Sequence, residues 1–349
     1  MTQEFENLLE LLQSPNKANV NLGLILLENY KEEFENHFKF SLEKDKELFE
    51  LLKQDKYWHF KTPLNKMKYL NWSEKQLSEV SPSIALMPNL RILYLAVNNL
   101  KMLPSEITTL QKLKHLRMNN NKFTEFPMEL IMLKFLKILH LSMSKISELP
   151  SEIQELKNLK FLYLDGSKLK KLPKEFVELQ NLEELYLSSN EMEVFPMEVV
   201  QLVNLKRLEL TETKLTSLPK EIRQLKKLKT IVMEETPLQN LPSEIGELSE
   251  LNELYLYRNQ LSTLPKGFEK LTKLKDLRLE SNKFTTLPKS ISALKNLRIL
   301  RLDNNLLEKL PIEIMNLKNL RELGLARNPI SAIEQEIIKR MLPNCQITF

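Results

Sequence analysis

The sequence predicts an α/β solenoid: a right-handed horseshoe with a concave parallel β-sheet, short helices on its convex side and a helical N-terminal cap. Two observations carry this prediction. A leucine recurs every 23 residues from Leu90 to Leu320 without insertion or deletion. Each of these units also contains one strand-like and one helix-like stretch. A unit of this size cannot bury a core alone, so its copies must stack.

The first half of each unit predicts a short strand. In the unit that starts at Leu90, Leu93 and Leu95 are separated by one residue, and this period of two places both leucines on one face of a strand. Stacking of identical units makes successive strands parallel neighbours. The leucines therefore form the core, and the residues between them face outward.

The second half of each unit predicts a short helix. In the first unit Ile107, Leu110 and Leu113 are three residues apart, which is the spacing of one helical face. A proline stands where each helix would start, a position that needs no amide proton, and it holds the preceding residue extended. These prolines are Pro104, Pro127, Pro150, Pro173, Pro196, Pro219, Pro242, Pro265, Pro288 and Pro311.

An asparagine follows most of the strands, where the chain turns and backbone groups would be buried without partners. Its amide both donates and accepts hydrogen bonds, so a stack of asparagines satisfies those groups from repeat to repeat. Ser144, Ser167, Thr213 and Thr236 replace it in two adjacent pairs, either as tolerated substitutions, which we favour, or as local weak points. The asparagines are Asn98, Asn121, Asn190, Asn259, Asn282, Asn305 and Asn328.

The complete unit reads L-x-x-L-x-L-x-x-N-x-L-x-x-L-P-x-E-I-x-x-L-x-x. This pattern resembles the leucine-rich repeat family, specifically the 23-residue intracellular type of bacterial proteins, whose convex side carries L-P-x-E-I. The resemblance covers the regular repeats at residues 90–327. It implies a horseshoe without catalytic machinery whose concave sheet binds another macromolecule, which in this family serves adhesion, signalling or immune recognition alike.

Both ends of the solenoid are expected to be closed by special segments. Residues 1–66 form a helical N-terminal cap or a separate recognition module, and residues 67–89 form a degenerate capping repeat. Residues 328–349 form a C-terminal cap, with a helix after Ser331 and a last edge strand that contains Cys345. The residues expected on the N-terminal helices and their aromatic joint are Phe5, Leu8, Leu9 and Leu12, then Val20, Leu24 and Leu27, then Leu48, Phe49 and Leu52, then Tyr57, Trp58 and Phe60.

Residue usage points away from catalysis and from metals. The five glycines form no phosphate-binding loop, and the four histidines accompany no C-x-x-C pair. His115 and His140 lie on adjacent strands but two residues out of step, about 8 Å apart on strand geometry. We therefore expect no enzyme, no catalytic residue, no metal and no cofactor.

Location and assembly are inferred from what the chain lacks. It has no secretory signal, no apolar stretch long enough to span a membrane and a single cysteine, Cys345, so no internal disulfide forms. We expect a cytoplasmic monomer. The net charge of +5 does not demand a nucleic-acid partner.

The outward-facing strand positions are the candidate binding surface. They are the second, fourth, sixth and seventh residues after the first leucine of each repeat, and about twelve rows at ~4.8 Å make a sheet on the order of 50 Å long. An aromatic first half would anchor a partner protein or peptide, and an acidic middle would select it. The predicted partner-binding residues are Ile92, Tyr94, Arg117, Ile138, His140, Phe161, Tyr163, Tyr186, Glu209, Glu212, Glu234, Glu235 and Tyr255.

Four alternatives stay open from the sequence. The aromatic ladder could stabilise the sheet without binding any partner. Arg207 could form an ion pair with Glu184 or Glu209 and so neutralise it. The lysine-rich convex side could bind nucleic acid or an anionic surface, although the outward strand positions carry eleven acids, six arginines and no lysine. A catalytic site near Tyr57, Trp58 and His59 would lack the usual carboxylate, histidine and nucleophile set.

Overall fold

The computed structural model describes residues 3–12, 14, 17–32, 34 and 64–349. The chain divides into two compact units, Met1–Ser144 and Lys145–Phe349, which are described in turn. The expected third helix near Leu48 and the aromatic joint at Tyr57, Trp58 and Phe60 lie outside the described residues.

The first unit begins with two helices that the sequence predicts. Helix α1 (Gln3–Leu12) and helix α2 (Lys17–Leu26) are followed by the 3-10 helix η1 (Leu27–Tyr30). Phe5, Leu8 and Leu12 are buried, as expected for one apolar face, and the Phe5 ring meets the edge of Phe34 with centroids 6.3 Å apart. The two helices are confirmed, while their role as a cap stays a prediction.

The rest of the first unit is a stack of parallel strands joined by 3-10 helices. Neighbouring strands pair in a register of one repeat, for example His115 with Ile92 on one side and with Ile138 on the other. Buried leucines such as Leu93 and Leu116 occupy the middle of each strand. The elements are η2 (Leu64–Lys66), β1 (Tyr69–Asn71), η3 (Pro82–Leu86), β2 (Ile92–Tyr94), η4 (Ser105–Thr109), β3 (His115–Arg117), η5 (Met128–Met132) and β4 (Ile138–His140).

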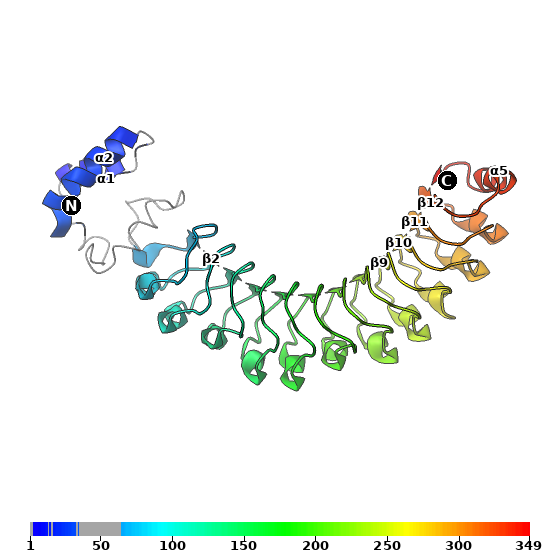
Figure 1. The fold of residues 1–349 in the computed structure, drawn as a ribbon, viewed down its shortest axis with the longest axis horizontal. Helices are drawn as coiled ribbons and strands as arrows, with labels where there is room; N and C mark the ends of the chain where they lie inside the picture. The colour runs from blue at the N-terminus through cyan, green and yellow to red at the C-terminus, as the bar shows by residue number, and fades with distance from the viewer. Residues whose placement is uncertain (1–2, 13, 15–16, 33, 35–63) are drawn as a thin grey trace. The chain divides into compact units, whose positions relative to one another are not determined.

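The second unit continues the same alternation and ends in an α-helix and a last strand. Its strands line one edge of the unit and its 3-10 helices line the opposite edge, from green to red in Figure 1. The elements are η6 (Ser151–Glu155), β5 (Phe161–Tyr163), η7 (Lys174–Glu178), β6 (Glu184–Tyr186), η8 (Met197–Gln201), β7 (Arg207–Glu209), η9 (Lys220–Gln224), β8 (Thr230–Val232), η10 (Ser243–Glu247), β9 (Glu253–Tyr255), η11 (Phe268–Lys270), β10 (Asp276–Arg278), η12 (Lys289–Ala293), β11 (Ile299–Arg301), η13 (Ile312–Asn316), β12 (Glu322–Gly324), α5 (Ala332–Met341) and β13 (Gln346–Thr348).

The short convex helices are 3-10 helices, which refines the prediction. Their hydrogen bonds span three residues, as from the Leu110 amide to the Ile107 carbonyl at 3.1 Å. Pro104 stands one residue before the helix in an extended conformation, with φ −72° and ψ 149°, and its carbonyl accepts from the Ile107 amide. The proline therefore caps the helix instead of forming its first residue.

The asparagine ladder is present and buried. Asn282 Oδ1 accepts from the Leu261 amide of the preceding repeat at 2.9 Å, while Nδ2 donates to the carbonyls of Leu256 at 2.8 Å and Leu279 at 3.1 Å. Each amide thus joins two repeats at the point where both strands end. The same three bonds recur at Asn98, Asn121, Asn190, Asn305 and Asn328.

The two threonines that replace asparagine make fewer bonds. Thr213 Oγ1 donates to the Leu210 carbonyl at 2.9 Å, and Thr236 Oγ1 lies 3.2 Å from the same carbonyl. Within the described residues neither hydroxyl accepts a backbone amide proton, because it is too short to reach the preceding turn as an asparagine does. These rows rely more on leucine packing than on side-chain hydrogen bonds.

The C-terminal segment contains the predicted helix and a last strand, while its role as a cap stays a prediction. Ser331 caps α5 by accepting from the Glu334 amide at 3.2 Å. Ile333 and Ile337 are 77% and 44% exposed, whereas Ile338 is fully buried. The helix rests on η13.

The thiol of the C-terminal segment is half-buried. Cys345 precedes β13, and burial raises its pKa to about 11, with a smaller contribution from Glu322. The thiol is therefore protonated at neutral pH, which agrees with a packing role.

Candidate functional site

The predicted partner-binding residues lie at the outward positions of the strands or just after them. Tyr94 is typical: it is half-buried between the fully buried Leu93 and Leu95, so its ring lies against the sheet with one side open to solvent. The strands carry Ile92, Tyr94, Arg117, Ile138 and His140 in the first unit and Phe161, Tyr163, Tyr186, Glu209 and Tyr255 in the second, and the loops after β7 and β8 carry Glu212, Glu234 and Glu235.

In the first unit an aromatic and cationic cluster forms around Tyr94. The rings of Tyr69 and His115 meet it edge-on at centroid distances of 5.5 and 5.0 Å. The Arg117 guanidinium lies 5.5 Å from its centroid, within the range of a cation–π interaction. Tyr69 is missing from the predicted site, although its position two residues after Met67 marks it as outward-facing.

The two histidines of this cluster are closer than their strand positions suggest. The rings of His115 and His140 lean together, with centroids 5.5 Å apart, because side chains on adjacent strands reach diagonally across the sheet. Burial, helped by the nearby charge of Arg117, lowers the pKa of His140 to about 4 and lowers that of His115 as well. Both rings are neutral at pH 7, and His115 Nε2 is buried without a hydrogen-bond partner.

This depressed pKa predicts a loss of stability in mild acid. The unfolded chain takes up a proton on His140 near pH 6.5, whereas the folded chain does so only near pH 4, so stability falls as the pH drops between these values. Between pH 6.8 and 5.2 we expect a loss of about 1 kcal/mol from this residue after allowance for solvent screening. Urea denaturation at both pH values, with His140→Gln as the comparison, measures it; an equal drop in both proteins contradicts the assignment.

In the second unit the strand surface begins with two stacked tyrosines. The rings of Tyr163 and Tyr186 lie 4.3 Å apart at an interplanar angle of 16°, and the Arg207 guanidinium is 5.9 Å from the centre of Tyr186. The Tyr186 hydroxyl donates to Glu184 Oε2 at 2.6 Å, and this bond together with burial raises the pKa of Tyr186. The stack is thereby held in one orientation.

A second such group follows at β9 and β10. The Arg278 guanidinium lies 4.7 Å from the centre of the Tyr255 ring and is also bonded to Asp276 at 3.2 Å. The Tyr255 hydroxyl donates to Asp276 Oδ2 at 3.2 Å, while burial raises the pKa of Tyr255 to about 12. Of these three residues the sequence singles out Tyr255 alone.

Most acids of the predicted selector are already engaged within the chain. Arg207 forms an ion pair with Glu209, as one of the open alternatives anticipates, and Arg258 pairs with Glu235 at 3.1 Å. Glu212 accepts from the Ser189 hydroxyl at 2.7 Å. Burial raises the pKa of Glu234, and it raises that of Glu280 on the neighbouring part of the strand surface in the same way.

Comparison with known proteins identifies the architecture. The family model described as leucine-rich repeat region matches residues 112–194 and 197–283, and the one described as leucine rich repeat matches residues 272–330. A solved leucine-rich repeat protein of Leptospira interrogans, LIC12759, is 42% identical over 82% of this chain and 73% of that chain, with a TM-score of 0.80. The chain belongs to the leucine-rich repeat family.

More distant leucine-rich repeat structures are also similar. The plant peptide hormone receptor RGFR1, solved in complex with RGF2, is 29% identical over 76% of this chain and 46% of that chain, with a TM-score of 0.64. An internalin of Listeria monocytogenes, InlF, is 22% identical over 90% and 96% of the two chains, with a TM-score of 0.68, and is alike in fold. Comparison with curated proteins found no match. The predicted solenoid of the bacterial leucine-rich repeat type is confirmed.

Every regular leucine-rich repeat turns after its strand through a residue with left-handed backbone. Glu212 and Glu235 occupy this position with φ of 53° and 51°, and Gly166 is the one glycine among its equivalents. Because the chain turns there, the side chain projects from the end of the strand, and Glu212 and Glu235 are exposed. Glu234, one residue earlier, is half-buried. Glu212, Glu234 and Glu235 of the predicted selector thus lie at the rim of the strand surface, whereas Glu209 lies on strand β7 itself.

Neither a metal-binding cluster nor a membrane-spanning helix occurs among the described residues. Among these residues no group of three or more histidine, cysteine, aspartate or glutamate side chains is placed to hold a metal ion. No helix in the same part of the chain has the length and apolar character needed to cross a membrane.

Proposed function

We propose that this leucine-rich repeat protein is a protein-binding scaffold that holds a partner protein or peptide on the outward residues of its strands. The observation that carries the proposal is the Tyr163–Tyr186 stack with Arg207 beside it. Tyrosine and arginine are the residue types that most often dominate protein interfaces, because they combine a large apolar surface with hydrogen-bonding ends.

The stack is ordered before any partner arrives. Glu184 holds the Tyr186 hydroxyl, and Glu209 holds the Arg207 guanidinium through its Nε at 2.6 Å. Side chains that are already fixed lose little conformational entropy when a partner covers them, so more of the contact energy appears as affinity. Lysine, whose chain is flexible and which interface cores avoid, is absent from these strand positions.

The relatives support an interaction scaffold as the general class. RGFR1 was solved in complex with RGF2, and a structure of the Toll–Spätzle complex from Drosophila, 26% identical over 72% of this chain and 35% of that chain, has a TM-score of 0.65. These partners are partners of those proteins. For this chain they favour a protein or peptide ligand over a small molecule, consistent with a long row of half-buried side chains on the strands.

The acidic selector is proposed in a narrower form. Glu209 and Glu235 would each have to leave an arginine before binding a basic partner. Glu234 is free of this competition: it forms no ion pair within the described residues, and burial keeps its pKa raised. A lysine or arginine of the partner placed near Glu234 would lower the pKa of Glu234 toward its ordinary value. The two side chains would also form a charge-assisted hydrogen bond.

The double variant Tyr163→Ala/Tyr186→Ala tests the proposal. The immobilised full chain is used to capture proteins from a lysate of the source organism, and the affinity of each purified candidate is then measured by surface plasmon resonance. We expect the double variant to lose on the order of 100-fold in affinity, because two central aromatic anchors are removed. Removal of the stack should cost about 0.5–1.5 kcal/mol of stability beyond the lost burial.

A matched control removes apolar side chains elsewhere in the same unit. Val194 and Val203 are 77% and 47% exposed and lie outside the strands. Val194→Ser/Val203→Ser should bind the partner as the unchanged protein does. Equal affinity of the tyrosine variant, or unfolding of that variant under the assay conditions, would show that the aromatic ladder serves the sheet and not a partner.

A further inference from the structure

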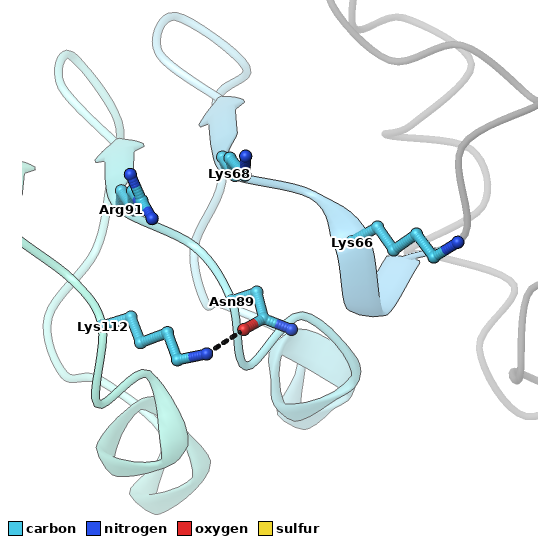
Figure 2. Close-up of a pocket in the computed structure, with 5 residues that line it drawn as sticks. All are labelled: Lys66, Lys68, Asn89, Arg91 and Lys112. Carbon is cyan, nitrogen blue, oxygen red and sulfur yellow. Dashed lines mark hydrogen bonds between the residues drawn. The ribbon is translucent and has the colours of Figure 1, made fainter.

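A hollow of about 420 Å³ lies in the first unit beside the starts of strands β1 and β2 (Figure 2). It is lined by Lys66, Lys68, Asn89, Arg91 and Lys112. This volume lies within the range of small-ligand sites, roughly 300–1,000 Å³. None of the five residues belongs to the outward strand positions discussed above, so the hollow is a separate feature of the surface.

The backbone of the repeats fixes the spacing of these side chains. Lys68 and Arg91 each precede a strand and occupy the same position of successive repeats, and the Arg91 amide donates to the Lys68 carbonyl at 2.8 Å. Lys66 and Lys112 come from the turns that lead into β1 and β3. Figure 2 shows the five side chains arising from successive turns of the solenoid.

Positive charge lines the hollow, and the described part of the chain does not neutralise it. Among the described residues no carboxylate forms an ion pair with Lys66, Lys68, Arg91 or Lys112. The amide of Asn89 takes the place of a carboxylate: its Oδ1 accepts from Lys112 Nζ at 2.6 Å, and its Nδ2 donates to the Asn65 carbonyl at 2.5 Å. Asn89 therefore bonds one of the four cations, Lys112.

In the second unit, glutamates occupy two of these repeat positions and form ion pairs with the neighbouring lysines. Glu183 occupies the position equivalent to Arg91 and binds the lysines on both sides of it, Lys160 at 2.6 Å and Lys206 at 2.5 Å. Glu250, equivalent to Asn89, pairs with Lys273 at 2.6 Å. In the second unit carboxylates thus neutralise Lys160, Lys206 and Lys273, whereas the hollow has an arginine and an asparagine at those two positions.

The uncompensated charge defines the chemistry of a ligand. Four like charges that line one hollow repel one another, and a bound anion would reduce that repulsion. Two phosphate groups carry roughly three to four negative charges at neutral pH, which matches the four cations, whereas a single carboxylate would neutralise one of them. Lysine and arginine are also the usual donors to phosphate oxygens. We propose that the hollow binds a ligand that carries two or more phosphate groups.

Isothermal titration calorimetry of the full chain with inorganic pyrophosphate tests this site. At pH 7.5 and low salt we expect saturable binding of one equivalent, weakened by added sodium chloride as ion pairs are screened. The variant Lys68→Gln/Arg91→Gln should lose at least about 10-fold in affinity, since two of the four charges are removed. Absence of binding by the unchanged protein at millimolar pyrophosphate, in both this arm and the vesicle arm below, overturns the proposal.

A matched variant separates the hollow from the total charge of the chain. Arg298 and Arg321 occupy the positions of Lys68 and Arg91 in two later repeats, but the residues equivalent to Lys66 and Lys112 there are Asn296 and Leu342. Arg298→Gln/Arg321→Gln removes the same two charges and should leave pyrophosphate affinity within about twofold of the unchanged protein. If both double variants lose affinity equally, binding is non-specific and the proposed site is wrong.

A comparison of vesicles with pyrophosphate distinguishes the two sources of the phosphate groups. Vesicles of phosphatidylcholine with a few per cent of a phosphoinositide present them on a lipid headgroup, and pyrophosphate presents them free in solution. Binding of either probe that depends on Lys68 and Arg91 supports the site and identifies the source. Tighter binding of a single-stranded RNA than of both probes, lost in the same variant, would instead make the hollow part of a nucleic-acid surface and contradict the proposal.

Discussion

Replacement of Asn282 by alanine should lower the free energy of unfolding by roughly 3–5 kcal/mol. The side chain is buried and joins two repeats, accepting from the Leu261 amide and donating to the carbonyls of Leu256 and Leu279. Alanine leaves the Leu261 amide and the Leu256 carbonyl buried without a protein partner, at about 1–3 kcal/mol for each group, whereas the Leu279 carbonyl still accepts from Asn305 Nδ2. Urea denaturation followed by circular dichroism measures the loss.

The chain itself offers a matched control. Thr236 stands at the equivalent position and donates from one hydroxyl, so Thr236→Ala should cost only about 1 kcal/mol. Amide hydrogen exchange adds a local readout: the Leu261 amide should lose its protection in Asn282→Ala before the amides of distant repeats do, because each repeat contacts only its neighbours. Equal costs at the two positions would mean that the ladder contributes little and that leucine packing alone holds the repeats.

The repeat architecture was predictable because each of its constraints is local in sequence. The alternation at Leu93 and Leu95 and the 23-residue period leave one way to stack the units, and a buried amide at Asn98 has only backbone groups to bond. The type of the convex helix was less predictable. An apolar spacing of three, as from Ile107 to Leu110, suits one face of an α-helix as well as a 3-10 helix, and the choice depends on how tightly the proline-capped turn must close.

The composition of the candidate site was predictable, but its pairings were not. The repeat places Tyr186, Glu184 and Arg207 on outward strand positions. Whether Glu184 or Glu209 forms the ion pair with Arg207 depends on side-chain rotamers on neighbouring strands. The proposed phosphate site was not predicted for another reason. Its signal is the residue just before each strand, where Lys68 and Arg91 stand without the carboxylate that Glu183 provides later, and this column lies outside the outward strand positions from which the candidate surface was predicted.

Replacement of Gly246 by alanine should destabilise the second unit by roughly 3 kcal/mol, although alanine normally favours a helical position. A Cβ atom at Gly246 would lie 2.0 Å from the carbonyl oxygen of Gly267 in the next repeat, and a backbone atom cannot move aside as the end of a side chain can. The carbonyl lies there because Gly267 adopts φ of +89°, which also shortens the following helix to Phe268–Lys270. Thermal and urea denaturation of Gly246→Ala would measure the cost.

The cause can be tested by a double-mutant cycle with Gly267→Glu. That change turns residues 264–268 into L-P-K-E-F, the sequence that residues 172–176 already have, where the helix runs over the full Lys174–Glu178 and the residue equivalent to Gly246 is Gln154. A repeat of that form accommodates a side chain at this position, so Gly246→Ala should be nearly neutral in the Gly267→Glu background. A coupling of about 2–3 kcal/mol between the two sites is expected. Additive effects would show that the clash arises from the packing of the helices and not from the left-handed turn at Gly267.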